Sequence, residues 1–231
     1  MDRPRLALLN ASYAKPMTRR NFRRELDADL VEFDVNEEQY PPDHAFDGFV
    51  VTGSAASVYW DEPWIPATET WVREAAERDL PGLGVCFGHQ LVASALGGTV
   101  EAMDDYELGY AEVDRSPDVP LFDGLDRRLT AFESHSDAVT ALPPGAEEIA
   151  TNDRAIQGFR YGDVFTVQFH PEYDTESAAR VTRGKDLPDE RIERVLDGVT
   201  EENYARACET KRLFDNFVAL VAARRAAEAA D

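Results

Sequence analysis

Lysine is the charged residue that this sequence has least of. Lys15, Lys185 and Lys211 are the only three, and acidic residues outnumber basic ones 45 to 24. A formal net charge of −21 leaves no basic patch of the kind that phosphate contacts require, so we expect no nucleic-acid binding. An acid-rich, lysine-poor surface resembles those of proteins from salt-loving organisms, where salt screens the self-repulsion, and it predicts a halophilic protein.

Cysteines and long apolar runs are also scarce. Cys86 and Cys208 lie far apart and form no disulfide framework, which favours a reducing cytoplasm. The sequence does not start with the charged and then apolar segment that is typical of a signal peptide. No apolar run approaches the length that spans a membrane. We therefore expect a soluble, cytoplasmic protein without a membrane partner. Aromatic residues at 10% and regular apolar segments argue against a disordered acidic chain.

The first hundred residues alternate strand-like and helix-like segments. Leu6–Asn10, Val31–Val35 and Gly48–Thr52 have the apolar or alternating pattern of strands. Thr18 is suited to cap a helix over Arg19–Leu26. This β-α-β-β order predicts a mainly parallel sheet with helices outside it.

Strand-like runs then follow in quick succession between residues 99 and 169, separated by Asp, Gly and Pro turns, which predicts antiparallel additions to the sheet. From Asp174 onward the pattern is helical, with one long helix expected over Glu202–Ala227. We therefore predict a single α/β domain over residues 1–231. It has an open, mainly parallel sheet, an added antiparallel region and a helical extension from about residue 174.

The segment Gly82–Leu91 has the pattern of a strand, a sharp turn and a helix, with Cys86 at the turn. Gly84 and Gly88 lie two residues either side of it, where a tight strand-to-helix turn has no room for a β-carbon. The helix N-terminus favours thiolate over thiol, so Cys86 is a candidate nucleophile. The alternative is a structural cysteine buried between strand and helix.

A candidate base follows a second apolar run. Val164–Phe169 leads into His170, which we expect at the carboxyl end of a buried strand and therefore in the same crevice as Cys86. Glu172 is placed to accept a hydrogen bond from the ring and fix its tautomer. His170 bonded only to backbone is the alternative. Zinc binding is poorly supported, because Cys86, His89 and His170 lack the usual ligand spacings.

Three motifs in this order resemble those of the class I glutamine amidotransferases. They are Gly84–Leu91, Ser134–Asp137 and Phe169–Glu172, and the similarity runs from about Leu6 to Glu172. The branch they resemble most is the amidotransferase-like part of GMP synthases. The resemblance implies a flavodoxin-like three-layer fold and a Cys86–His170–Glu172 triad. Such a triad cleaves the side-chain amide of glutamine through a γ-glutamyl thioester.

The same resemblance implies further roles. The backbone N–H groups of Gly53 and Phe87 would form the oxyanion hole, Gln90 would bind glutamine, and His135 and Ser136 would hold the amino-acid end of the substrate. One departure is the loop Thr52-Gly53-Ser54, where the family usually has Gly-Gly-Pro. No phosphate-cradling loop of the kind needed to make an activated acceptor is present. We expect no cofactor.

The partner and the substrate stay open at this stage. About 60 residues follow Glu172, too few for a synthetase domain, so ammonia is expected to pass to a separate synthetase subunit or not to be channelled. A γ-glutamyl peptidase acting on γ-glutamyl amides or peptides is the alternative enzyme. The two enzymes differ in the leaving amine. A pocket that discriminates between them would lie at the aromatic loop Tyr59–Trp64, which is either a lid or a packed surface loop. A binding module that has lost catalysis and a different cysteine hydrolase are further alternatives.

Overall fold

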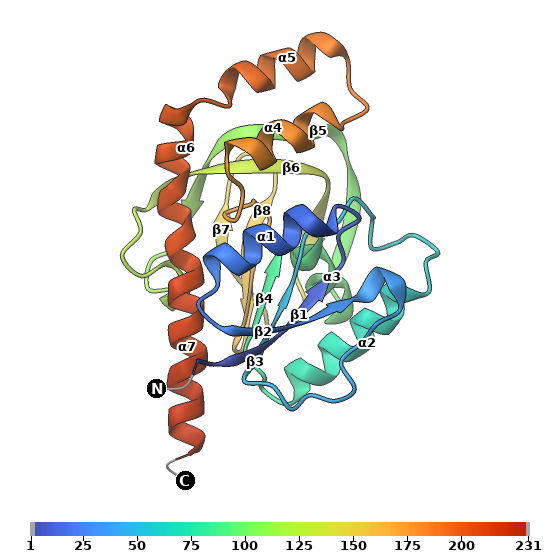
Figure 1. Cartoon of the computed structure of the whole chain (residues 1–231), viewed down its shortest axis with the longest axis vertical. Coiled ribbons are helices and arrows are strands. Elements are labelled where there is room, and N and C mark those ends of the chain that lie inside the picture. The colour runs from blue at the N-terminus through green and yellow to red at the C-terminus, as the bar shows by residue number, and fades with distance from the viewer. Residues whose placement is uncertain (1–2, 230–231) are drawn as a thin grey trace.

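The computed structural model describes residues 3–229 and contains one mixed sheet flanked by helices (Figure 1). Its nine strands are ordered β2-β1-β3-β4-β9-β8-β7-β5-β6. The strands from β2 to β9 in this order pair in parallel, and those from β9 to β6 pair antiparallel. The predicted fold class, a mainly parallel sheet with an antiparallel addition, is therefore confirmed.

The strands are β1 (Arg5–Asn10), β2 (Asp29–Asp34), β3 (Gly48–Val51), β4 (Gly82–Val85), β5 (Thr99–Arg115), β6 (Arg128–Ala141), β7 (Glu147–Thr151), β8 (Ile156–Tyr161) and β9 (Val164–Val167). The helices are α1 (Lys15–Glu25), α2 (Trp64–Glu77), α3 (Phe87–Ala95), α4 (Thr175–Arg183), α5 (Asp189–Gly198), α6 (Glu201–Ala207) and α7 (Arg212–Glu228). Short 3-10 turns are η1 (Val35–Glu37), η2 (Pro120–Phe122) and η3 (Cys208–Lys211).

Both faces of the parallel strands are covered, which is why β3, β4 and β9 are buried at every residue. On one face Phe22 of α1 and Phe214 of α7 pack against the sheet and meet edge-to-face, 6.0 Å between ring centroids. On the other face Trp71 of α2 and Phe87 of α3 close a second core. This double burial fixes the carboxyl ends of the parallel strands, where the candidate site lies.

The helix boundaries differ from two of the expectations. α1 begins at Lys15, and Thr18 lies inside it with its hydroxyl donating to the backbone oxygen of Ala14, so Thr18 is not a cap. The long C-terminal helix is interrupted by η3, where the Thr210 hydroxyl donates back to the Ala207 oxygen at 2.7 Å. Such local side-chain bonds compete with α-helical geometry and favour a tighter 3-10 turn.

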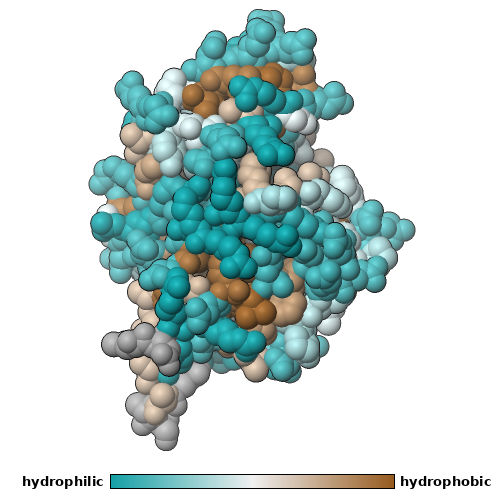
Figure 2. Space-filling view, in the orientation of Figure 1, coloured by the Kyte–Doolittle hydropathy of each residue, from teal (hydrophilic) through white to brown (hydrophobic). Residues whose placement is uncertain are grey.

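Hydrophilic residues cover most of the face shown in Figure 2, as the acidic composition requires. Among residues 3–229, no helix is both long and apolar enough to cross a membrane. Helices α4 and α5 lie beside the curved β5–β6 hairpin, and α6 and α7 run along one side of the molecule (Figure 1).

Candidate active site

The candidate site lies at the carboxyl ends of three neighbouring parallel strands. Gly53 follows β3, Cys86 follows β4 and His170 follows β9, and β4 pairs with both β3 and β9. Residues at the carboxyl ends of adjacent parallel strands meet at one edge of the sheet, the usual location of a site in open α/β folds. A β-carbon on Gly53 would lie 3.0 Å from Cε1 of His170 and 3.6 Å from Cβ of Cys86, so the three residues are in one crevice.

The turn at Cys86 is strained and closely packed. Cys86 has φ 54° and ψ −106°, a positive φ that a non-glycine residue adopts at a cost of about 1–3 kcal/mol. A β-carbon on Gly84 would lie 2.6 Å from the Gly88 oxygen, and one on Gly88 would lie 2.3 Å from the Val51 oxygen. The two glycines therefore let α3 start directly behind the strand, with Cys86 at the apex.

His170 is held in one orientation by three contacts. Its Nδ1 lies 2.9 Å from Oε1 of Glu172, its backbone N–H donates to the Phe132 oxygen at 2.9 Å, and Tyr173 stacks on its ring with centroids 4.1 Å apart. Because Nδ1 is engaged with Glu172, Nε2 is the ring nitrogen left for the sulfur. His170 and Glu172 are both buried.

The charges of the thiol and the ring stabilise one another. Burial raises the pKa of the Cys86 thiol, but the charge of His170 and a hydrogen bond to it bring that pKa below its ordinary value, with smaller contributions from His135 and Lys185. Burial lowers the pKa of His170, and the charges of Cys86 and Glu172 raise it above its ordinary value. The arrangement thus favours a thiolate–imidazolium pair.

Phe87 is the first residue of α3, and Gly53 lies in the adjoining loop after β3. The first N–H groups of a helix have no partner within it and point outward at its N-terminus. The two residues expected to form an oxyanion hole therefore come from segments on adjacent strand ends, beside Cys86.

Gln90 does not face solvent, although it lies on a helix. It is buried on α3, and its Nε2 donates to the Asp137 backbone oxygen at 3.0 Å and to Oε1 of Gln168 at 3.1 Å. Asp137 in turn accepts from Ser57 at 2.5 Å and from the Tyr59 hydroxyl at 2.7 Å. The aromatic loop is thereby tied to β6, although the Tyr59 side chain is half exposed.

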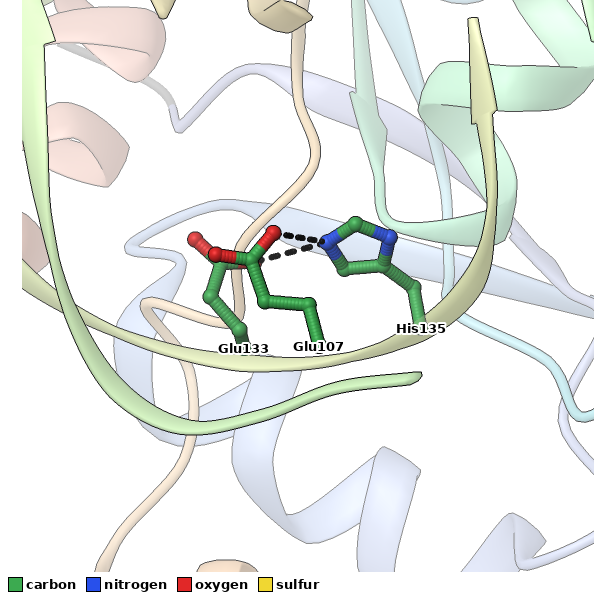
Figure 3. Close-up of side chains that lie close together, drawn as sticks. All are labelled: Glu107, Glu133 and His135. Atoms are coloured by element: carbon green, nitrogen blue, oxygen red, sulfur yellow. Dashed lines mark ion pairs between the residues drawn. The ribbon is translucent and has the colours of Figure 1, made fainter. Parts of the chain in front are cut away.

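His135 lies in a buried ionic cluster of the β5–β6 hairpin (Figure 3). Its Nε2 is 3.0 Å from Glu107 and 3.4 Å from Glu133, and its Nδ1 is 3.0 Å from the Asp137 oxygen. Burial lowers the pKa of His135, but the two carboxylates raise it to about 10. The ligand atoms of these three residues lie within 4.8 Å of one another, the spacing a metal ion requires, but here the imidazolium pairs the carboxylates. Ser136 is half-buried beside this cluster.

A pocket of about 150 Å³ opens beside the triad candidates. Of the residues predicted for the site, Gly53, His170 and Glu172 line it, whereas Cys86, Phe87, Gln90, His135 and Ser136 are not among its lining residues. Tyr173 and Lys185 also line it, although no sequence motif predicted a role for either. Lys185 could have been singled out from the sequence because it is one of three lysines. Nothing in the sequence pointed to Tyr173 except that it follows Glu172 directly.

Comparison with known proteins places this chain in a family. Residues 9–183 match the family described as glutamine amidotransferase class-I, and the chain belongs to this family. It is 42% identical over 126 residues to the GMP synthase [glutamine-hydrolyzing] of Thermomicrobium roseum, covering 54% of this chain and 23% of the relative. It is 31% identical over 182 residues to that of Aromatoleum aromaticum, covering 74% and 33%. The chain thus spans about a quarter to a third of these relatives.

Solved structures share the fold over nearly the whole chain. A glutamine amidotransferase from Thermotoga maritima has a TM-score of 0.77 at 22% identity, covering 94% of this chain and 99% of that one. A glutamine amido transferase from Methylobacillus flagellatus has a TM-score of 0.71 at 19% identity, covering 96% and 94%. These structures match the described sheet and its helical flanks together.

Proposed function

We propose that this chain hydrolyses the side-chain amide of glutamine to glutamate and ammonia. Cys86 is the nucleophile, His170 transfers the protons and Glu172 orients the ring. The observation that carries the proposal is the strained turn at Cys86, which lies with the His170 ring beside Gly53, while Nδ1 of that ring lies 2.9 Å from Glu172. A cysteine with only a structural role would not require a positive φ next to an oriented histidine.

The reaction follows from these roles. The Cys86 thiolate attacks the γ-carbonyl carbon, and the oxyanion accepts hydrogen bonds from the N–H groups of Gly53 and Phe87, each contributing about 3–4 kcal/mol. Collapse breaks the carbon–nitrogen bond, and ammonia leaves with a proton from His170. Water, deprotonated by His170, then hydrolyses the thioester, which releases glutamate and restores the thiol.

Gln90, His135 and Ser136 hold the amino-acid end of glutamine in this proposal. Gln90 and His135 both contact the backbone oxygen of Asp137, at 3.0 Å each, so their side chains set the position of the β6 backbone beside α3. They act by shaping this wall rather than through an exposed side chain, since both are buried.

The ammonia produced is supplied to a synthetase. Relatives carry the name GMP synthase [glutamine-hydrolyzing], and this chain matches only about a quarter to a third of their length. A GMP-forming synthetase is therefore the first partner to test.

Release of glutamate and ammonia from L-glutamine tests the proposal. Wild-type protein should form both products in equal amounts, and Cys86→Ala should form neither. Cys208→Ala is the matched control, since Cys208 is the other free cysteine and lies in η3. Equal rates for wild type and Cys86→Ala would exclude Cys86 as the nucleophile.

A further inference from the structure

One face of the β5–β6 hairpin carries three ionisable side chains. Glu133 and His135 are two residues apart on β6, so their side chains point to the same face of the strand. Glu107 of β5 lies directly opposite His135 in the antiparallel register. All three side chains are buried, with Glu133 0% exposed, and both carboxylates meet at the His135 ring (Figure 3). Because none of the three lines the pocket beside His170, this cluster is a separate feature of the molecule.

The His135 ring is oriented as a metal-binding histidine would be. Its Nδ1 lies 3.0 Å from the backbone oxygen of Asp137, and because a carbonyl oxygen only accepts, Nδ1 carries a proton. The other ring nitrogen, Nε2, faces the two carboxylates, at 3.0 Å from Glu107 and 3.4 Å from Glu133. Metal-binding histidines donate one ring N–H to a carbonyl or carboxylate in this way and direct the lone pair of the other nitrogen at the ion.

The charges of the cluster do not balance with protein groups alone. Two carboxylates and one imidazolium sum to a net charge of −1. Among residues 3–229, no lysine or arginine lies within ion-pair distance of Glu107 or Glu133. Neither oxygen of the buried Glu133 carboxylate accepts a hydrogen bond. A buried charge without a counter-charge or hydrogen bonds is unfavourable. A divalent cation in place of the Nε2 proton of His135 would bring the sum to zero.

The spacing and the chemistry of these ligand atoms suit zinc. In a tetrahedral zinc site with bonds of about 2.0–2.1 Å, neighbouring ligand atoms lie about 3.3 Å apart. The separations of 3.0 and 3.4 Å from Nε2 of His135 lie either side of this value, and all three ligand atoms are within 4.8 Å of one another. One imidazole with two carboxylates favours Zn²⁺ over Mg²⁺ or Ca²⁺, which prefer oxygen ligands alone.

We propose that Glu107, Glu133 and His135 bind one Zn²⁺ ion. When the ion binds, Nε2 of His135 loses its proton to solvent and gives its lone pair to the metal, and no electron is transferred. The ion ties β5 to β6, the strand that carries Asp137, whose backbone oxygen accepts from Gln90. This inference does not depend on the proposed hydrolysis of glutamine, because none of the three ligands takes part in the thiol chemistry.

Two amide side chains support the ligand Glu107. Nδ2 of Asn152 donates to its Oε1 at 2.8 Å, and Nε2 of Gln157 donates to its Oε2 at 3.3 Å. Residues that hydrogen-bond a ligating carboxylate orient it toward the metal in this way. Oε1 of Gln157 is buried and has no hydrogen-bond partner. Three protein ligands leave a fourth position of the zinc for water, and this oxygen is an acceptor available to it.

Zinc retention by the full chain tests the proposal. Cys86→Ala and Cys208→Ala are both introduced, because thiolates bind zinc on their own. The protein is stripped with a chelator, given one equivalent of Zn²⁺ in excess Mg²⁺, which occupies exposed carboxylates, and separated from free metal by gel filtration. Elemental analysis should find about one zinc per chain. Glu133→Gln should weaken zinc binding at least about tenfold, since even residues that only orient a ligand cost about 10–100-fold.

Glu112→Gln is the matched control and should keep the zinc, because Glu112 is an exposed carboxylate of β5 that pairs with Arg206. NMR of ¹⁵N-labelled histidine rings is a second readout that needs no glutamate variant, in case Glu133→Gln does not fold. Zinc should shift the Nε2 signal of His135 and leave the signals of the other three histidines in place. No zinc retained, equal retention in Glu133→Gln, or a shift of another histidine with His135 unmoved would overturn the proposal.

Discussion

The guanidinium of Arg24 donates a hydrogen bond to the backbone oxygen of Glu172, with 2.6 Å between Nη2 and O. Arg24 lies in the last turn of α1 and also bonds Asp174 at 2.7 Å, the residue that caps α4. α1 therefore positions the segment that carries His170 and Glu172, although Arg24 itself does not line the pocket.

Arg24→Met should lower kcat for glutamine about 5- to 30-fold, since a lost charged hydrogen bond is worth about 1–2 kcal/mol. KM should change little, because Arg24 positions Glu172 and does not touch substrate. Arg23→Met is the control. Arg23 is the neighbouring arginine, half exposed, and pairs with Glu32 instead. Equal kcat losses in the two variants would contradict a positioning role for Arg24.

Glu172→Gln should narrow the pH range of activity from the alkaline side. The active thiolate–imidazolium pair exists above the lowered pKa of Cys86 and below the raised pKa of His170. The Glu172 charge helps to raise the pKa of His170, so its removal moves the alkaline limb of kcat/KM to lower pH. Glu176→Gln removes a nearby exposed carboxylate and should leave this limb in place. An alkaline limb unmoved by Glu172→Gln would contradict the assignment.

Gly53→Ala should reduce glutamine hydrolysis while the protein stays folded. The new β-carbon would lie 3.0 Å from Cε1 of His170, so the ring has to shift by a few tenths of an ångström from its place beside Cys86. We expect kcat to fall about tenfold or more, because catalytic geometry is sensitive to shifts of this order. Activity and thermal unfolding are measured together; wild-type kcat in a folded Gly53→Ala protein would contradict the placement of this loop.

Gly88→Ala should destabilise the whole fold. Its β-carbon would lie 2.3 Å from the backbone oxygen of Val51, an atom of β3 that cannot move without displacing the strand. Overpacking of this kind costs about 3 kcal/mol or more in the free energy of unfolding. Gly198→Ala, where nothing lies within 4 Å of the added carbon, should be close to neutral. Urea unfolding compares the two, and similar midpoints would contradict the tight packing of α3 on β3.

Local patterns were sufficient to predict the sheet and the turn at Cys86. The strands β1, β3, β4 and β9 are buried on both faces, so each is an apolar run that can be recognised from its own residues. Gly84 and Gly88 indicated a close approach that the structure places between backbone atoms. These features depend on residues near one another in sequence.

Apart from the approach of His170 to Cys86, contacts between residues distant in sequence were not predictable. Tyr59 and Asp137 are 78 positions apart, and their hydrogen bond sets the aromatic loop against β6. Lys185 reaches the pocket only because α4 folds back over β5, where Tyr106 holds it. No local periodicity encodes such contacts. The break at η3 was missed because Cys208–Lys211 has the composition of a helix, and only the back-bonding of Thr210 reveals the 3-10 turn.

Alkylation by iodoacetamide at about pH 7, below the ordinary thiol pKa of about 8.5, tests most directly whether Cys86 and His170 form a thiolate–imidazolium pair. Cys208 is an internal control, a free and more exposed thiol. Peptide mapping should find Cys86 modified first despite its burial, with activity lost in step, glutamine protecting it and His170→Ala slowing it. Cys208 reacting first, or modification of Cys86 without loss of activity, would contradict the account.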